Sequence, residues 1–480
     1  MNDFRKLALC AVAIAGLVAC GGGGGGSAPP TAVLSVAVVG TGFVASNPSG
    51  IDCHADCSEA YALNTVVTLV PFAGTGQTFA GWGGDVDCAD GIVTLSAARQ
   101  CTATFIATGG PRIAAGKVFS LARSVIGSVY SWGSDAAGSL GDGTGAQDRS
   151  VPGPTSHTTT IDAIATAPSA QHALAIERST GRVWGWGDNA AGQLGDHSQV
   201  VRPAPVLMRD VNSAEVTTAV AVAVGAGHSL VLRADGVVLG VGLNDGGQLG
   251  DGTAQSRNFA AAVPDVCGSR MAATAIAAGI DFSLALCADG SLRAWGANSD
   301  GQLGTGNYSD SATPVVVSGI AGHTVSAIAA GGHFALALDT DGFVWSWGSN
   351  SRGQLGTDST VVTQSNVPTR IGGFVAGVAI AAGLEHAMVL LANNAVFAWG
   401  ANDSGQVSPQ DAGSAPQIDF SFHVLGLPAI VEIAAGQSHS MAIDSTGAVW
   451  AWGGNGGGQL GIGSTTAPSK PTQIAGLKLN

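Results

Sequence analysis

The chain has 480 residues, a formal net charge of −14 and only 11% charged residues. Lys and Arg do not cluster anywhere, and nucleic-acid binding needs a basic patch that neutralises phosphates, so this composition argues against a nucleic-acid partner. Glycine accounts for 73 residues and hydrophobic residues for 46%, which is typical of an all-β chain rich in tight turns. The length predicts one large domain and one small domain.

The N-terminus has the pattern of a targeting segment. Arg5 and Lys6 precede the apolar run Leu7–Val18, which is too short to cross a bilayer as a helix. The run continues into Ala19 and Cys20 and is followed by consecutive glycines. This Leu-x-Ala-Cys ending resembles the lipobox of bacterial lipoproteins.

The lipobox resemblance implies that residues 1–19 are a lipoprotein signal peptide and that residues 20–30 are a lipidated, Gly-rich linker. The Cys20 thiol would carry the lipid, and Gly21 in place of Asp resembles the class sorted to the outer membrane. We therefore expect an exported protein that is anchored to the bacterial cell envelope and touches the membrane only through its lipid. An ordinary secretory signal with an incidental Cys20 is the alternative.

The sequence pattern of residues 31–108 predicts a small β module. Gly-x-Val-x-Ser-x-Pro-x-Gly-Ile-x-Cys, followed by Val-Thr-Leu and Phe-Ala-Gly-Trp, resembles the divergent internalin B-type repeats of bacterial surface proteins, which implies a spacer or adhesion unit. The strands expected from the apolar runs are Val33–Val39, Thr65–Val70, Thr78–Trp82 and Cys101–Ile106. Asp85, Asp87 and Asp90 share one loop, but their spacing differs from a calcium loop and no Glu completes it. We predict a solvated acidic loop and no metal site.

Cysteine usage predicts disulfides. Once the signal peptide and the lipidated residue are set aside, an even number of cysteines remains, which in an exported chain indicates cystines. Metal binding is the alternative, but only one Cys pair comes near ligand spacing. Proximity favours the pairs Cys53–Cys57, Cys88–Cys101 and Cys267–Cys287, although other pairings stay open.

Residues 111–480 are dominated by an internal repeat. A Trp-Gly anchor, with Val-Gly in the third copy, recurs every 52 to 55 residues at Trp132, Trp186, Val241, Trp295, Trp347, Trp399 and Trp452. Each copy contains an apolar strand, an Asp-Gly or similar turn expected to have positive φ at both centres, and a second strand that reaches the anchor. Seven such units predict a closed ring of four-stranded blades. The pattern resembles the regulator of chromosome condensation repeat family, which implies a seven-bladed β-propeller.

The ends of the repeat region suggest how the ring closes. The first copy begins with the Ile-Ala-Ala-Gly strand that ends at Gly116, whereas the chain stops at Asn480 before another such strand. We predict that the two ends share one blade.

Candidate chemistry is sparse. The histidines His172, His228, His333, His386 and His439 are placed at one repeat position, with Phe119 and Phe282 at that position in the other copies. A position that accepts Phe is expected to be structural, and no catalytic motif or phosphate loop is present. We predict a non-enzyme without cofactors. The family's eukaryotic namesake acts on a small GTPase through an insertion, and no copy here carries one, so no small GTPase partner is expected.

Binding is the function that remains. A variable loop follows each Gly-Gln-Leu-Gly or related segment, and all of these loops are expected on one rim of the ring. Phe259 and Tyr308 are the aromatic residues of these loops and are candidate anchors, or isolated surface aromatics. We predict a scaffold that binds a protein partner in adhesion or envelope interactions. The alternatives are an inhibitor of a secreted hydrolase and a glycan-binding module, and the scarcity of loop aromatics weighs against the latter.

Overall fold

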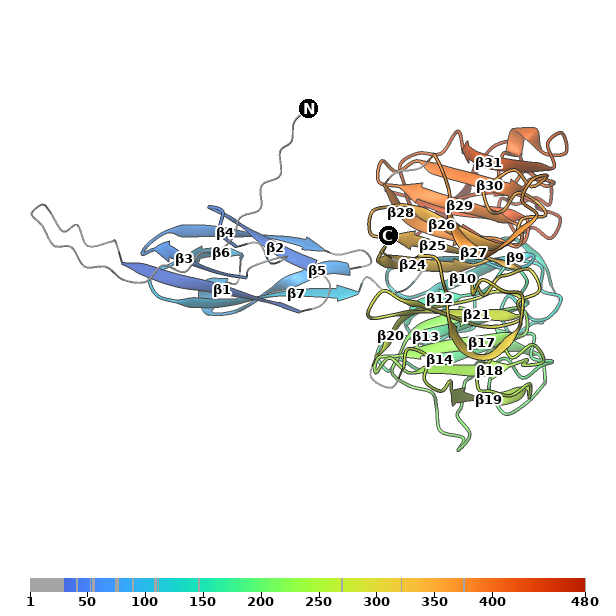
Figure 1. The fold of residues 1–480 in the computed structure, drawn as a ribbon, viewed down its shortest axis with the longest axis horizontal. Helices are drawn as coiled ribbons and strands as arrows, with labels where there is room; N and C mark the ends of the chain where they lie inside the picture. The colour runs from blue at the N-terminus through green and yellow to red at the C-terminus, as the bar shows by residue number, and fades with distance from the viewer. Residues whose placement is uncertain are drawn as a thin grey trace, which may run out of the picture. The chain divides into compact units, whose positions relative to one another are not determined.

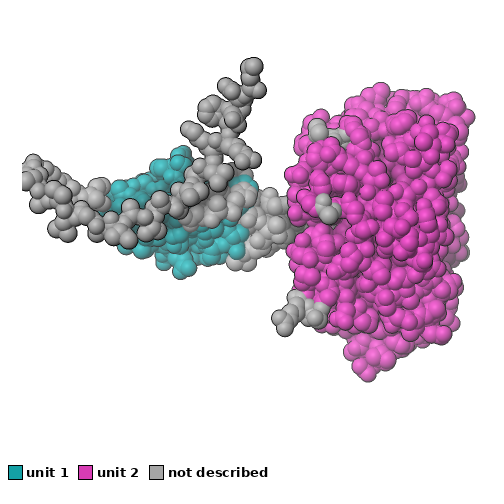
Figure 2. Space-filling model, in the orientation of Figure 1, with its two compact units in different colours: residues 1–108 teal, residues 109–480 magenta. Residues whose placement is uncertain are grey.

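The computed structural model describes residues 30–479, apart from 40–41, 52, 54–56, 74–76, 89, 108–109, 111, 146, 269–270, 321 and 374–375. The expected signal peptide and the lipidation residue Cys20 therefore lie outside the described residues. The chain divides into two compact units, residues 1–108 and residues 109–480 (Figure 2).

The first unit is a two-layer β sandwich. Its sheets have the strand orders β3-β1-β7-β5 and β2-β4-β6. Leu34 and Cys101 from one sheet and Val67 and Val93 from the other belong to one buried core. Alternation explains the layers, because Val67 is buried whereas Val66 before it is exposed. The elements are β1 (Thr31–Val39), β2 (Gly42–Asn47), β3 (Ser58–Ala62), β4 (Val66–Ala73), β5 (Gln77–Gly84), η1 (Val86–Cys88), β6 (Ile92–Thr94) and β7 (Arg99–Ala107).

The second unit contains seven four-stranded antiparallel sheets, each built from consecutive strands (Figure 1). The first strand of each sheet contacts the first strand of the next, and the last such strand contacts the first, which closes the ring. This arrangement confirms the predicted all-β class, a seven-bladed β-propeller preceded by a disulfide-bonded β domain.

The bounds of the first three blades are β8 (Ile113–Ala115), β9 (Phe119–Arg123), β10 (Val129–Gly133), β11 (Arg149–Pro154); β12 (Ile161–Ala165), β13 (His172–Glu177), β14 (Val183–Gly187), β15 (Arg202–Leu207); and β16 (Ala219–Val224), β17 (His228–Arg233), β18 (Val238–Gly242), β19 (Arg257–Ala262). The other four blades are β20 (Ala273–Ala278), β21 (Phe282–Cys287), β22 (Leu292–Gly296), β23 (Ser311–Val316); β24 (Val325–Ala330), β25 (Phe334–Asp339), β26 (Val344–Ser349), β27 (Gln364–Arg370); β28 (Gly377–Ala382), β29 (His386–Leu391), β30 (Val396–Ala401), β31 (Gln417–His423); and β32 (Ile430–Ala435), β33 (His439–Asp444), β34 (Ala448–Gly453), β35 (Thr472–Lys478). The short helix η2 (Pro409–Asp411) lies between β30 and β31.

The prediction that the two chain ends share one blade is wrong, because β8 to β11 and β32 to β35 each form a complete sheet. The ring is closed instead by side chains across the interface between the last and first blades. We call each interface between neighbouring blades a seam. Glu432 pairs with Arg112 at 3.0 Å and accepts the backbone N–H groups of Arg112 and Ile113 at 2.7 and 3.1 Å. At the register position of Glu432 the neighbouring blades have Ala, as at Ala379. The interface between the last and first blades therefore has an ion pair in addition to the hydrogen bonds that Ser120 and Trp132 make with the last blade.

Six of the seven seams are fastened by an anchor Trp that bonds to the preceding blade, and the exception is the seam before the third blade, whose anchor is Val241. Trp295 is fully buried, and its Nε1 donates to the carbonyl of Gln248 in the preceding blade at 2.9 Å. The Ser283 hydroxyl donates to the same carbonyl at 2.8 Å, and His228 Nε2 lies 3.0 Å from Ser283 Oγ. Because the Ser283 proton is committed to Gln248, the imidazole donates from Nε2. Burial lowers the pKa of His228 to about 3, with a smaller contribution from His172.

The seams follow a pairing rule. Wherever the repeat position holds His, the next blade offers Ser, and wherever it holds Phe, the next blade offers Ala in the same apolar cluster. The hydrogen-bonded pairs are His172–Ser229, His228–Ser283, His386–Ser440 and His439–Ser120. The apolar pairs are Phe119–Ala173, Phe282–Ala335 and Phe334–Ala387. These histidines are structural.

Two details of the predicted repeat are wrong. His333 does not occupy the shared position, because Phe334 pairs with Gly348 as His228 pairs with Gly242, which places His333 one residue earlier and half-exposed. In the Asp-Gly hairpins only the glycine has positive φ, as at Gly236. The connection from β17 to β18 is longer than two residues, so a single left-handed glycine is enough to close it.

Candidate functional site

The strand order gives the propeller two distinct faces. The connections from first to second strands and from third to fourth strands lie at one end of every blade, and we call this the loop face. The hairpins between second and third strands, the links between blades and the entry of the chain at Arg112 lie at the other end, the hairpin face. The variable loops therefore share one rim, as the repeat predicts, and the chain enters from the opposite face.

A buried amide holds each variable loop. In the third blade, Asn244 is fully buried and its Oδ1 accepts the N–H of Leu249 at 2.8 Å. Its Nδ2 donates to the carbonyls of Thr253 and Gln255 at 3.0 and 3.2 Å. Because one side chain joins both ends of the loop, the loop is rigid.

The same amide recurs in the other blades, with one exception. The equivalent residues are Asn189, Asn298, Asn350, Asn402 and Asn455, each with its Oδ1 on a backbone N–H and its Nδ2 on loop carbonyls. The first blade has Asp135, which is buried; its Oδ1 accepts the N–H of Leu140, but its Oδ2 has no hydrogen-bond partner. Burial raises the pKa of Asp135.

The loop glycines allow the blades to approach closely. Gly247 has φ +81°, and a Cβ there would lie 2.7 Å from Ala312 Cα in the next blade. Gly247 is therefore a contact point between blades.

Charge differs between the faces. Among the residues that the structure describes, Asp and Glu outnumber Lys and Arg by more than two to one on the loop face, whereas on the hairpin face they nearly balance. The described loop-face carboxylates, apart from buried Asp135, are Asp142, Asp148, Asp188, Asp196, Asp245, Asp251, Asp281, Asp300, Asp310, Asp358, Glu385, Asp403, Asp411 and Asp419, and the cations are Lys117, Arg149, Arg202, Arg257, Arg352 and Lys470. The hairpin-face carboxylates are Asp162, Glu177, Asp210, Glu215, Asp235, Asp265, Asp289, Asp339, Asp341, Glu432 and Asp444, and the cations are Arg112, Arg123, Arg178, Arg182, Arg209, Arg233, Arg293, Arg370 and Lys478.

The loop-face arginines are themselves engaged in ion pairs. Their partners are neighbouring carboxylates, in the pairs Arg149–Asp142, Arg202–Asp196, Arg257–Asp251 and Arg352–Asp403. None of these arginines pairs with Asp281, so the loop face around Asp281 keeps its negative charge. Burial raises the pKa of Asp281, Asp245 raises it further, and His333 opposes this shift. Sequence reasoning did not identify these pairs, although an Arg follows the loop Asp in each of the first three copies.

The two candidate anchors have different environments. Tyr308 lies in a loop and is 46% exposed, so a partner can reach it. Phe259 lies within strand β19 and is half-buried, and its ring stacks on His197 with centroids 5.9 Å apart. Phe259 is thus not a loop tip, although it lines a cavity described below.

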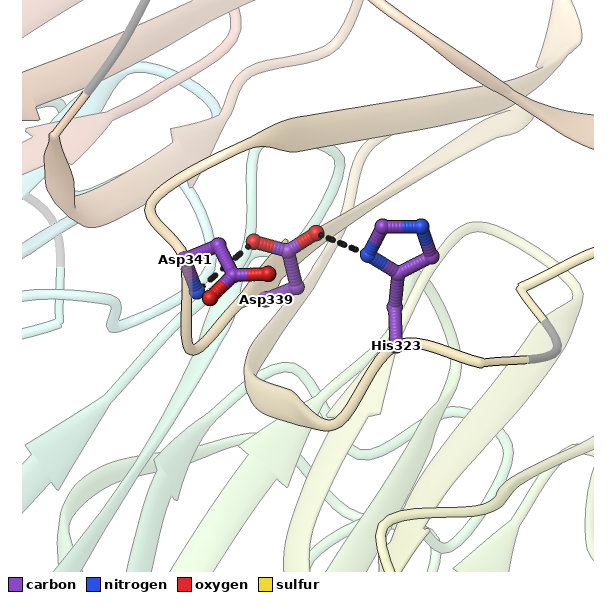
Figure 3. A group of neighbouring side chains, drawn as sticks. All are labelled: His323, Asp339 and Asp341. Carbon is purple, nitrogen blue, oxygen red and sulfur yellow. Dashed lines mark hydrogen bonds and ion pairs between the residues drawn. The ribbon is translucent and has the colours of Figure 1, made fainter. Parts of the chain in front are cut away.

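One cluster has residue types that bind metals. His323, Asp339 and Asp341 offer ligand atoms within 4.8 Å of one another on the hairpin face (Figure 3). Asp339 Oδ1 accepts the N–H groups of Asp341 and Phe343, and its Oδ2 accepts Trp345 Nε1 at 3.0 Å and contacts His323 Nδ1 at 3.1 Å. Both carboxylate oxygens of Asp339 already accept protein groups, so Asp339 caps this hairpin.

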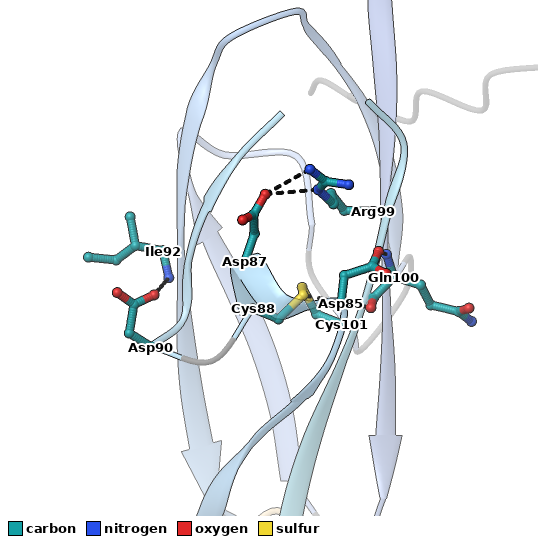
Figure 4. The surroundings of a disulfide bond; sticks show 8 residues. All are labelled: Asp85, Asp87, Cys88, Asp90, Ile92, Arg99, Gln100 and Cys101. Carbon is teal, nitrogen blue, oxygen red and sulfur yellow. Dashed lines mark hydrogen bonds and ion pairs between the residues drawn. A yellow bond between two sulfur atoms is a disulfide. The ribbon is translucent and has the colours of Figure 1, made fainter. Parts of the chain in front are cut away.

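The acidic loop of the first unit is likewise occupied by protein groups (Figure 4). Asp87 pairs with Arg99 at 2.8 Å, and Asp85 accepts the N–H of Gln100 at 2.8 Å. Asp90 accepts the N–H of Ile92 at 2.9 Å. The disulfide Cys88–Cys101 lies beside them, and Cys53–Cys57 and Cys267–Cys287 are also formed. These are the three pairs that proximity favours.

No helix in the part of the chain that the structure describes is long and apolar enough to cross a membrane.

Comparison with known proteins assigns the second unit. Two models of the regulator of chromosome condensation (RCC1) repeat match residues 180–232, 289–338, 341–390 and 446–480, and residues 219–248, 273–302, 325–354, 378–406 and 430–459. The E3 ubiquitin-protein ligase HERC2 of Homo sapiens is 29% identical over 75% of this chain, which spans only 7% of that protein. The ultraviolet-B receptor UVR8 of Arabidopsis thaliana is 28% identical over 77% of this chain and 82% of its own.

Solved structures agree with this assignment. Human WBSCR16 superposes with a TM-score of 0.63 at 27% identity, over 72% of this chain and 94% of its own. Yeast RCC1 (Prp20), in its complex with Kap60, superposes with a TM-score of 0.64 at 22% identity, over 77% and 88% of the two chains, which shows a shared fold. The chain belongs to the regulator of chromosome condensation (RCC1) repeat family.

Proposed function

We propose that this protein is an exported, lipid-anchored propeller that binds a basic protein surface through its loop face and performs no catalysis. The observation that carries the proposal is the loop face itself, on which seven variable loops are each held by a buried Asn or Asp and carry excess negative charge. A rigid loop loses little conformational entropy on binding, so its contacts convert efficiently into affinity.

Two further features support the exported, anchored arrangement. All six cysteines among the described residues form disulfides, which is typical of oxidising compartments. The chain enters the ring at Arg112 on the hairpin face, so a tether attached there leaves the loop face free. The lipobox resemblance implies that the protein is anchored through Cys20. In this proposal its lipid holds it at the outer membrane of the cell envelope.

Protein recognition also has precedent among similar propellers. The yeast structure is of RCC1 (Prp20) bound by Kap60, and a second yeast structure is described together with binding to Gsp1p and histones. For this chain the partner is defined by charge, because excess carboxylates favour a surface rich in Lys and Arg and speed its approach.

Capture from cell-envelope extract tests the proposal. The full chain immobilised through its N-terminus should retain one or a few proteins at low ionic strength, and retention should fall steeply as salt is raised. Retention that does not depend on salt would contradict a charge-guided partner. Anchoring is tested separately: Cys20→Ser should move the protein from the membrane to the soluble fraction, and a variant that stays membrane-bound would contradict lipidation.

A further inference from the structure

A cavity of about 490 Å³ lies at the outer part of the loop face between the second and third blades. Gln199 comes from the loop after β14, and the rest of the lining runs from Asp251 to Phe259 in the next blade. Its volume is within the range of small-ligand sites in proteins, about 300–1,000 Å³. The residues that line the cavity do not include Asp281 or the His, Ser and Trp residues that bond between blades.

The charges in this cavity are already neutralised. The Asp251 carboxylate pairs with Arg257, and its Oδ1 also accepts the N–H and hydroxyl of Thr253 at 2.9 and 2.8 Å. Asn244 Nδ2 donates to the same oxygen at 3.1 Å. A charged ligand would have to compete with these internal partners, so the cavity favours a neutral one.

The groups left for a ligand are primary amides. Gln199, Gln255 and Asn258 line the cavity, and their side chains form no hydrogen bond with the described part of the chain. An amide offers both a donor and an acceptor, which matches a hydroxyl group. The Phe259 ring, held in place by its stacking on His197, adds a flat apolar surface beside them.

We infer that this cavity binds a neutral saccharide. A pyranose ring combines hydroxyl groups that donate and accept with a flat face of C–H groups, and the lining supplies a counterpart to each. The loop that carries Gln255 is fixed from below by Asn244, whose Nδ2 donates to the Gln255 backbone carbonyl at 3.2 Å, so the backbone that carries this amide is in place before the ligand arrives. The site is distinct from the proposed protein-binding surface in the chemistry of its ligand.

Titration of the full chain with glucose, galactose, N-acetylglucosamine, maltose, cellobiose and diacetylchitobiose, followed by saturation-transfer NMR and calorimetry, tests this inference. At least one of these sugars should bind, and Gln255→Ala and Phe259→Ala should each weaken that binding by roughly tenfold. Tyr308→Ala, an aromatic change in the next loop outside the cavity, is the matched control and should bind as the parent does.

Thermal melting of each variant separates lost binding from lost folding. Gln255 is exposed, so Gln255→Ala should melt with the parent even if Phe259→Ala does not. Binding of none of these sugars, or binding that survives both cavity variants, would overturn the inference.

Discussion

The two faces of the propeller are built from one repeat, yet they are stabilised in different ways. On the loop face a buried Asn, or Asp135 in the first blade, closes each variable loop from below, so exposed loop residues are free to vary. On the hairpin face the second strand often ends in a carboxylate that caps the turn, as Asp444 does by accepting the N–H of Thr446 and Trp450 Nε1 at 2.8 and 2.9 Å. The variable loops are thus the ones supported from inside the blade, and this is why we propose the loop face as the surface that binds a partner.

Charge reversal gives the largest expected contrast between the faces. Asp245→Lys, Asp281→Lys and Asp300→Lys together should reduce capture of the envelope partner by about 100-fold or more, because several rim charges act on one partner. The matched hairpin-face variant, Asp235→Lys with Asp265→Lys and Asp289→Lys, should bind as the parent does. Surface plasmon resonance at low and high salt measures both. An equal loss of partner binding in the two variants would show that the loop face and the hairpin face do not differ in recognition.

Acid should weaken the seams. His172, His228 and His386 have a pKa lowered by burial to about 3, and His439 to about 4, from an ordinary value of 6.5. The unfolded chain then binds more protons, so stability is complete above pH 6.5 and falls as the pH decreases towards 4. Each histidine contributes about 1.4 kcal/mol per pH unit in that window. Urea denaturation at a series of pH values measures the slope.

A paired substitution shows whether the seam histidines cause this slope. His228→Phe with Ser283→Ala converts one seam to the apolar type and should reduce the pH dependence while preserving the fold. His228→Phe alone should be less stable than the double variant, because the buried Ser283 oxygen loses the hydrogen bond from His228. These seams lie on the loop-face side, since Ser283 and Trp295 both bond to Gln248. A double variant with an unchanged slope would assign the acid response to other groups.

Two substitutions in the last blade compare the supports directly. Asn455→Ala and Asp444→Ala each remove a buried group that bonds to backbone N–H, and each should lower the free energy of unfolding by about 1–3 kcal/mol. Only Asn455→Ala should also weaken partner capture, because it releases a loop of the binding face. Chemical denaturation and capture assays together decide this. Weakened capture by Asp444→Ala at matched stability would contradict the division of roles.

Asp135→Asn should have the smallest effect. A folded-state pKa raised above its ordinary value means that Asp135 costs stability as the pH rises through that pKa. The amide of the other blades should therefore stabilise the protein by about 1 kcal/mol at neutral pH and by less near pH 4. Denaturation at the two pH values checks this. Destabilisation at neutral pH would show that the carboxyl is needed by its loop.

The sequence predicted the fold well because period and glycine placement are local signals repeated around the ring. The position of Trp132 and its equivalents identified the blades, and proximity favoured the pairs Cys88–Cys101 and Cys267–Cys287. The way in which the ring closes was predicted wrongly because the Arg112–Glu432 pair joins positions far apart in the chain, and neighbouring blades have Ala at the position of Glu432.

The candidate site was predicted less completely. The common rim of the variable loops follows from repeat symmetry, so it could be predicted. The half-buried place of Phe259 could not, because its stacking on His197 depends on how two adjacent loops meet. His333 was assigned to the wrong repeat position for a related reason. When two copies are aligned one residue out of register, a buried strand position is exchanged for an exposed one.

Hydrogen–deuterium exchange on the complex with the captured partner tests the central claim most directly. Protection should appear in the loops around Asp245, Asp281 and Asp300, and the hairpins at Asp235 and Asp289 should exchange as in the free protein. Protection confined to the hairpin face, with the variable loops unchanged, would contradict recognition through the loop face.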